Sequence, residues 1–176
     1  TKQAIIICDD TGNVFHEFKG LGGGGHYTFS PDGKLAYFKM PVRQRGGKEP
    51  TPLEIHVVNL DGTNDKILLS IPAEKSNYIR NLHLSWPDKI NDWFIASFFP
   101  SNVIPEKYEP PLDEIMLIKT NGTVKYLART KTVLPPGFRM FWAIPLASPS
   151  SDGKRINFNS NSSGDIDQYI LFVDTN

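Results

Sequence analysis

The sequence predicts an all-β protein, a β-propeller made of four-stranded antiparallel blades. Three observations support this: strand signals recur in a fixed order, tight Asp-Gly or Asn-Gly turns recur with them, and 14 glycines and 14 prolines cluster between short apolar runs. The repeat recurs about every 55–60 residues, stretched by insertions beyond the ~40–50 residues of ordinary propeller blades. The fixed order favours stacked blades over a plain β-sandwich, which also uses short strands and turns.

The first complete repeat covers residues 26–71. A short strand leads into the turn Asp32-Gly33, and an alternating strand follows it through Phe38. After an insertion, a second hairpin forms around Asp61-Gly62 and ends near Ile71. Asp-Gly supplies the positive φ angles that two-residue hairpins need, so consecutive strands should pair antiparallel. The repeat therefore predicts one four-stranded meander.

Three further segments repeat parts of this pattern. Residues 82–128 carry a second complete copy, and residues 142–176 carry a copy that lacks its outermost strand. Residues 1–20 show only the two outer strands of an earlier copy, and the sequence offers no helix beyond one turn within Tyr78–Leu84. We therefore expect about three blades plus part of a fourth, the C-terminal part of a larger ring. Upstream blades or a partner chain would complete the ring, because an open blade leaves unpaired edge groups in water.

The turn motifs resemble those of a known family. Ser30-Pro-Asp-Gly-Lys34, Ser150-Ser-Asp-Gly-Lys154, Val57–Gly62 and Leu117–Gly122 are similar to the WD40-like repeat of TolB-type propellers. The resemblance covers nearly the whole chain and specifies blade construction well, but biochemical activity poorly. Because TolB-like propellers are commonly exported, it implies a periplasmic or secreted protein.

Composition excludes some partners. The chain has 176 residues, and its 19 basic and 19 acidic residues cancel, which gives no electrostatic footprint for nucleic acid. No run of 18 or more apolar residues is present, so the sequence predicts no membrane span. The single cysteine, Cys8, sits in an apolar run and is expected to be a small buried hydrophobe.

Propeller geometry separates the connections into two faces. The tight turns, such as Asp61-Gly62 and Asn121-Gly122, belong to one face. The long connections belong to the opposite face, and function usually resides in loops held by a rigid scaffold. We therefore expect the ligand- or protein-binding surface on the face formed by the long loops, which are 21–26, 41–52, 72–81, 100–111 and 130–142.

Two histidines occupy matching positions in their repeats. His26 and His83 each precede the short strand before a Pro-Asp pair, so each should lie where an innermost strand enters from the long-loop face. Neighbouring blades would then hold both imidazoles within reach of one ligand or ion. Leu146 takes the matching position in the third repeat, which argues against a symmetric three-residue metal site. The alternative is that both histidines only cap strands through hydrogen bonds.

Arginines and aromatic residues accompany the histidines in the connections between blades. Such pairs suit a sugar ring and a carboxylate, through stacking and bidentate pairing. They suit packing between blades equally well, and both interpretations stay open. His16 and His56 lie on outer strands and are expected to be structural. The remaining ligand-binding candidates are Tyr78, Arg80, Arg139, Phe141 and Trp142.

Two functions remain open from the sequence. The first is a binding or scaffold domain for a protein or carbohydrate ligand; the second is a carbohydrate-active enzyme. The blade pattern is similar to that of oligogalacturonate lyase-like propellers, in which histidines and a glutamine hold a divalent metal. This resemblance implies that His26 and His83 bind a metal that acidifies the proton beside a uronate carboxylate, while an arginine holds the acid. The other ligands would come from upstream blades, and no catalytic residue is assigned.

Overall fold

The computed structural model describes residues 4–19, 26–41, 50–101, 107, 109–133 and 139–174. Within them the chain forms four antiparallel sheets in sequence order. The first sheet contains β1 (Ala4–Cys8) and β2 (Val14–Lys19), and the second contains β3 (Thr28–Phe29), β4 (Lys34–Lys39), β5 (Leu53–Asn59) and β6 (Lys66–Ile71). The third contains β7 (Ile79–Ser85), β8 (Trp93–Pro100), β9 (Glu114–Lys119) and β10 (Val124–Arg129), and the fourth contains β11 (Ser148–Pro149), β12 (Arg155–Ser160) and β13 (Asp167–Phe172).

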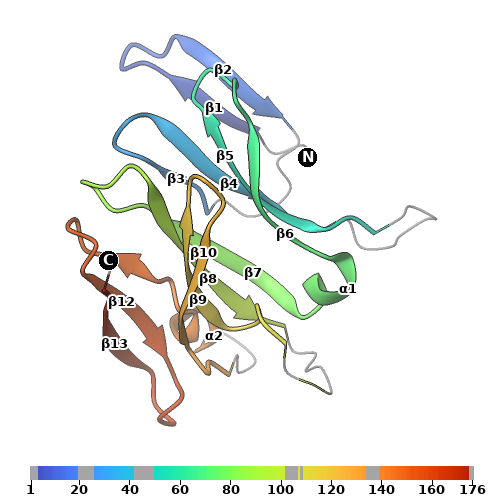
Figure 1. Cartoon of the computed structure of the whole chain (residues 1–176), viewed down its shortest axis with the longest axis vertical. Coiled ribbons are helices and arrows are strands. Elements are labelled where there is room, and N and C mark those ends of the chain that lie inside the picture. Colours follow the sequence, from blue (N-terminus) through green and yellow to red (C-terminus); the bar gives the residue numbers. More distant parts are fainter. Residues whose placement is uncertain are drawn as a thin grey trace.

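The sheets follow one another as a fan, from the β1–β2 hairpin at one end to the β12–β13 pair at the other (Figure 1). Every hydrogen-bonded neighbour within a sheet is also its neighbour in sequence. This is the meander that the turn signals predict, and the all-β propeller architecture is confirmed as a partial propeller. The two complete sheets have four strands each, and the two end sheets have two and three.

The middle sheets are buried on both faces, as stacked blades require. In β8, Trp93 and Ile95 pack towards the fourth sheet, whereas Phe94, Ala96 and Phe98 pack towards the second. Because successive side chains of a strand point to opposite faces, one apolar run fills two cores. The seven residues Trp93–Phe99 are all buried. A nearly continuous apolar strand is therefore the signature of a sheet packed on both sides.

Polar bonds between sheets fix how the innermost strands meet. The Trp86 backbone N–H donates to Thr28 Oγ1 at 2.9 Å, and the Ala147 backbone N–H donates to Ser97 Oγ at 3.1 Å. Both bonds are at least partly buried, where an unmatched amide would cost about 1–3 kcal/mol. These bonds join each inner strand to the sheet beside it, in addition to the apolar cores.

Two short helices lie outside the sheets, α1 (Ala73–Ser76) and α2 (Arg139–Ala143). The expected helical turn within Tyr78–Leu84 is wrong, because Ile79–Ser85 is strand β7 and alternates towards the core. The helix instead begins after Pro72, whose fixed φ suits a helix start. Neither helix is long or apolar enough to span a membrane, and the same holds throughout the described residues.

Candidate functional site

Two histidines from neighbouring sheets meet at one point. The Nδ1 atoms of His26 and His83 lie 3.1 Å apart, and their rings stand edge to face with centroids 5.3 Å apart. His26 lies two residues before β3, and His83 lies within β7 opposite Ser97. The sequence predicted that neighbouring blades hold these rings within common reach, and the distance agrees. It placed His83 at the strand entrance, whereas β7 begins four residues earlier.

Burial keeps both rings neutral near pH 7. Desolvation lowers the pKa of His26. Desolvation, and then the positive charge that His26 gains when it is protonated, lower the pKa of His83 to about 4. In two neutral imidazoles that meet at Nδ1, one ring donates its N–H and the other accepts through its lone pair. The pair can therefore offer a base, an acceptor or a metal ligand without first losing a proton.

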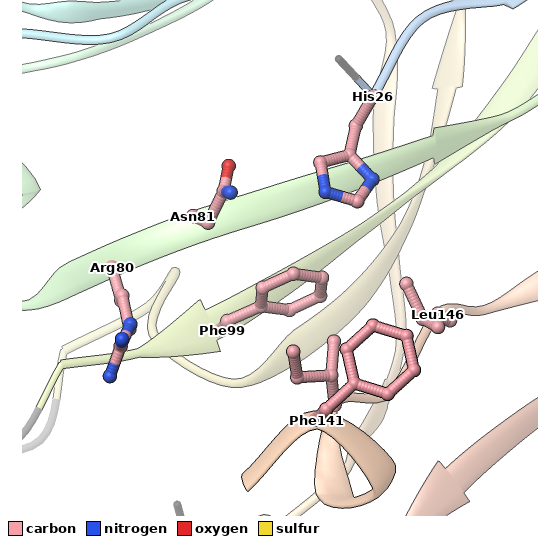
Figure 2. A pocket seen from close by; sticks show the side chains of 7 residues that line it. His26, Arg80, Asn81, Phe99, Phe141 and Leu146 are labelled. Carbon is pink, nitrogen blue, oxygen red and sulfur yellow. The ribbon is translucent and has the colours of Figure 1, made fainter. Parts of the chain in front are cut away.

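A cavity of about 190 Å³ opens beside the pair. Asn81 and Phe99 are cross-strand partners at the ends of β7 and β8, and both line it. Figure 2 shows Phe99, Phe141 and Leu146 on one side, with Arg80 and Asn81 of β7 across from them. The full lining is His26, Arg80, Asn81, Phe99, Phe141, Ile144 and Leu146. The cavity thus draws on the loop before β3, on β7 and β8, and on the segment around α2.

Two aromatic side chains of α2 lie side by side, and the first of them lines the cavity. Phe141 and Trp142 are 53% and 52% exposed, and their rings lie edge to face with centroids 5.3 Å apart. Contiguous exposed apolar patches on a soluble protein mark interaction sites, whereas single exposed apolar residues are common. Phe141 lines the cavity itself, so this pair extends an apolar platform from it.

The other sequence candidates fall in different places. Tyr78 is half-buried, packs against the core between the second and third sheets, and does not line the cavity. Arg139 begins α2, and its side chain lies outside the described residues. Most of the long loops also lie outside them, including parts of 41–52, 100–111 and 130–142 and the glycine run before His26.

Leu146 adopts a left-handed φ of 44° and lines the cavity, although the sequence treated it only as a departure from the histidine pattern. Asn81 and Phe99 were missed altogether. Each lies near the long-loop end of an inner strand, and they are brought together by the pairing register of β7 and β8. This register cannot be predicted before the ends of the strands are known.

The two remaining histidines take different positions. His56 is 3% exposed, stacks on Tyr37, and has Asp65 Oδ1 2.8 Å from its Nδ1 and Glu54 Oε2 3.2 Å from its Nε2. This network ties β4, β5 and the turn before β6 together. His16 lies over Gly62 of the second sheet, where a Cβ would come within 2.4 Å of its ring. Both are placed as packing residues rather than towards the cavity.

The described residues do not by themselves make a metal site. No three His, Cys, Asp or Glu side chains among them gather closely enough to hold an ion. Leu146, which takes the matching position in the third repeat, lines the cavity, and its side chain has no donor atom. His26 and His83 supply two ligands at most, and a further one would have to lie outside the described part of the chain.

The stacked sheets define a section of a β-propeller, and the cavity lies where the segments that lead into the second and fourth sheets approach the third sheet. Comparison with solved structures supports this class. An oligogalacturonate lyase in complex with manganese aligns with a TM-score of 0.55 and 18% identity. The alignment covers 86% of this chain and 35% of the lyase chain. TolB from Acinetobacter baumannii aligns with a TM-score of 0.59 and 15% identity, over 98% of this chain and 35% of TolB. Oligogalacturonate lyase from Vibrio parahaemolyticus aligns with a TM-score of 0.57 and 16% identity, over 86% of this chain and 36% of the lyase.

These likenesses show the fold alone, because all identities are at or below 18%. The chain spans about a third of the length of each of these proteins. No protein-family model and no curated protein matches the sequence. The suspected resemblance to TolB-type and lyase-type propellers is thus confirmed at the level of fold.

Proposed function

We propose that this chain is the ligand-binding section of a β-propeller, and that its long-loop face receives the ligand at the His26–His83 cavity. The observation that carries the proposal is one cavity, with polar and apolar sides, lined by the third sheet, by the loop before β3 and by the segment around α2. Ligand sites are typically apolar concavities with a few convergent polar groups. A volume of about 190 Å³ is below the usual 300–1,000 Å³, so it suits one ring or one side chain.

The chemistry of the lining favours a ring that carries an acid. Phe141 offers a half-exposed aromatic face for stacking, and Arg80 stands across the cavity from it. A guanidinium can bind a carboxylate through two parallel hydrogen bonds. The neutral His26 ring, which lines the cavity, adds a hydrogen-bonding nitrogen for a hydroxyl group. A uronic acid combines these features, and an acidic aromatic side chain of a protein ligand shares the carboxylate and the flat ring.

Titration with galacturonate, followed by tryptophan fluorescence, tests this proposal. We expect saturable quenching in wild type and at least about tenfold weaker binding in Arg80→Ala, since charged hydrogen bonds contribute about 1.5–3 kcal/mol. Arg155→Ala is the matched control, because that exposed arginine pairs with Asp152 at the opposite face. Equal binding of glucose and galacturonate, or equal affinity in Arg80→Ala and Arg155→Ala, would contradict the role of the guanidinium.

A second candidate function is a metal-dependent lyase acting on uronate-containing sugars. The converging Nδ1 atoms of His26 and His83 favour it, because neutral imidazole is a common metal ligand. It requires further ligands from outside the described residues. The test is metal content and uronide cleavage by the protein that contains these blades, with His26→Ala and His83→Ala as variants. Absence of both metal and cleavage in wild type would exclude this function and leave the binding proposal standing.

Export to the periplasm or beyond the cell is part of the same proposal. It rests on the fold likeness to TolB and on the earlier resemblance in the turns. Fractionation of cells that express the complete gene would test it: recovery in the cytoplasm alone would contradict export.

A further inference from the structure

Three sheets of this chain share one hairpin, which allows their faces to be compared residue by residue. In the turns after β1, β5 and β9, the N–H of Gly12, Gly62 and Gly122 donates to the carbonyl three residues before it, at 3.1, 2.9 and 2.9 Å. Counting back from these glycines matches Ile6 with His56 and Met116. The same count matches Cys8 with Val58 and Ile118.

The matched positions differ sharply in exposure. His56 and Met116 are 3% and 0% exposed, whereas Ile6 is 57% exposed. Val58 and Ile118 are 2% and 0% exposed, whereas Cys8 is exposed. In β5 and β9 these positions face the preceding sheet: Val58 shares a core with Phe18 of the first sheet, and Ile118 shares a core with Leu68 of the second. The outward face of β1 is thus the same surface without its preceding sheet.

The surroundings of the three turn glycines also show that the first sheet lacks a preceding neighbour among the described residues. A Cβ at Gly62 would meet the His16 ring at 2.4 Å, and a Cβ at Gly122 would meet the Leu68 carbonyl at 4.0 Å. Both neighbours belong to the outermost strand of the preceding sheet, and Lys66 Nζ adds a hydrogen bond to Thr120 O at 3.1 Å. No described atom lies within 4 Å of a Cβ at Gly12. The contact that recurs between sheets is therefore open at the first turn.

The opposite end of the fan is built differently. The strand register matches Gln168 of β13 with Ile55 of β5, and Asn157 of β12 with Ala36 of β4. Ile55 and Ala36 are fully buried, while Gln168 and Asn157 are exposed and polar. Ile170 and Phe172 are the apolar exceptions there. Because polar side chains tolerate water, we restrict the inference to the face of β1.

We propose that the outward face of β1 docks a further antiparallel blade, supplied by the same polypeptide ahead of Thr1. Its outermost strand would place a side chain over Gly12, as β2 places His16 over Gly62. The same polypeptide is favoured over a second copy because β5 and β9 each pair with the strand that precedes them in sequence. Among the described residues, β1 pairs only with β2, so its other edge requires the same kind of strand.

The single cysteine reports directly on this surface. The expectation that Cys8 is buried is wrong, because Cys8 is exposed on the face in question, and the sequence contains no other thiol. We expect rapid reaction with a disulfide reagent in the 176-residue chain. In the polypeptide extended by its natural upstream sequence, with any added cysteines changed to serine, the rate should fall at least about tenfold, because reaction then needs local opening.

Three outcomes would overturn the proposal. Equal rates in the two proteins would show that no blade covers β1. Protection of Cys8 in the 176-residue chain together with a dimeric mass in light scattering would assign the surface to a second copy. A gene whose coding sequence starts at Thr1 would leave no segment to dock.

Two isoleucines of similar exposure give a matched stability test. Ile6 is 57% exposed and Ile67, on the outermost strand of the second sheet, is 49% exposed. In the extended polypeptide Ile6→Asn should lower the melting temperature by at least about 5 °C, because it places an amide in a buried contact. Ile67→Asn should change it by less than about 2 °C. Equal small shifts from both variants would contradict docking, and thiol protection remains readable if one variant fails to fold.

Discussion

The two faces of this fan use polar groups in opposite ways. On the tight-turn face, serines and aspartates satisfy their own backbone: Ser30 Oγ accepts from the Lys34 N–H at 2.7 Å, and Ser150 Oγ accepts from the Arg155 N–H at 3.1 Å. On the long-loop face, the ring nitrogens of His26 and His83 meet beside a cavity. The polar groups of the tight-turn face therefore bond within their own turns, whereas the long-loop face presents polar side chains to a cavity.

The difference teaches where to look for function in a repeat protein. The Ser-Pro-Asp-Gly and Asn-Gly turns recur because each must reverse the chain in two residues, and any member of the set works equally well. His26 and His83 are useful only because two different sheets bring them to one place. The repeated turns therefore report how the fold is built, whereas the site depends on contacts between different sheets.

The largest effect should come from the core on which both faces rest. Phe98 is fully buried between the second and third sheets. Phe98→Ala should lower the free energy of unfolding by about 3–5 kcal/mol, through lost burial and an unfilled cavity. Urea denaturation measures it. A loss below about 1 kcal/mol would show that the sheets are not packed as described.

A matched glycine pair sharpens the comparison on the tight-turn face. Gly62 and Gly12 have φ of 82° and 89°, so an alanine is strained at both. Only at Gly62 would the new Cβ strike the His16 ring. Gly62→Ala should therefore cost about 2–3 kcal/mol and Gly12→Ala about 1 kcal/mol. If urea denaturation showed equal losses in the free energy of unfolding for both variants, the contact between His16 and the turn at Gly62 would be contradicted.

On the long-loop face the effect should depend on pH. The pKa of His83 falls from 6.5 to about 4 on folding, so the folded state binds this proton more weakly than the unfolded state. The contribution of the neutral His83 ring to the free energy of unfolding is fully present above pH 6.5 and decreases as the pH falls towards 4. Relative to pH 7, His83→Asn should reduce the loss of stability at pH 4.5 by about 1–2 kcal/mol, after allowance for partial solvent access. An unchanged pH profile would contradict the burial of this ring.

The smallest effect should come from an exposed ion pair among the tight turns. Arg155 Nη2 lies 3.7 Å from Asp152 Oδ2, and both side chains are about half exposed. Exposed pairs of this kind contribute little because water screens them. Arg155→Ala should shift the melting temperature by less than about 2 °C in calorimetry. A shift in melting temperature above 5 °C would contradict the expectation that this ion pair contributes little to stability.

The sequence predicted the sheets well because their determinants are local. Asp-Gly and Asn-Gly turns fix each hairpin, and nearly continuous apolar segments such as Trp93–Phe98 mark the strands that are buried on both faces. The site was predicted only in part. His26 and His83 stood out by their places in the repeat, but Asn81 and Phe99 reach the cavity through strand register across two sheets. Such register depends on packing, which no short stretch of sequence encodes.

The most direct test of this account is an NMR titration of the histidine rings. If two sheets stack so that His26 and His83 meet, the His83 ring should titrate near pH 4, and His26→Ala should raise the pKa of His83. A His83 ring that titrates near 6.5 and ignores the His26 substitution would contradict both the meeting of the rings and the site built upon it.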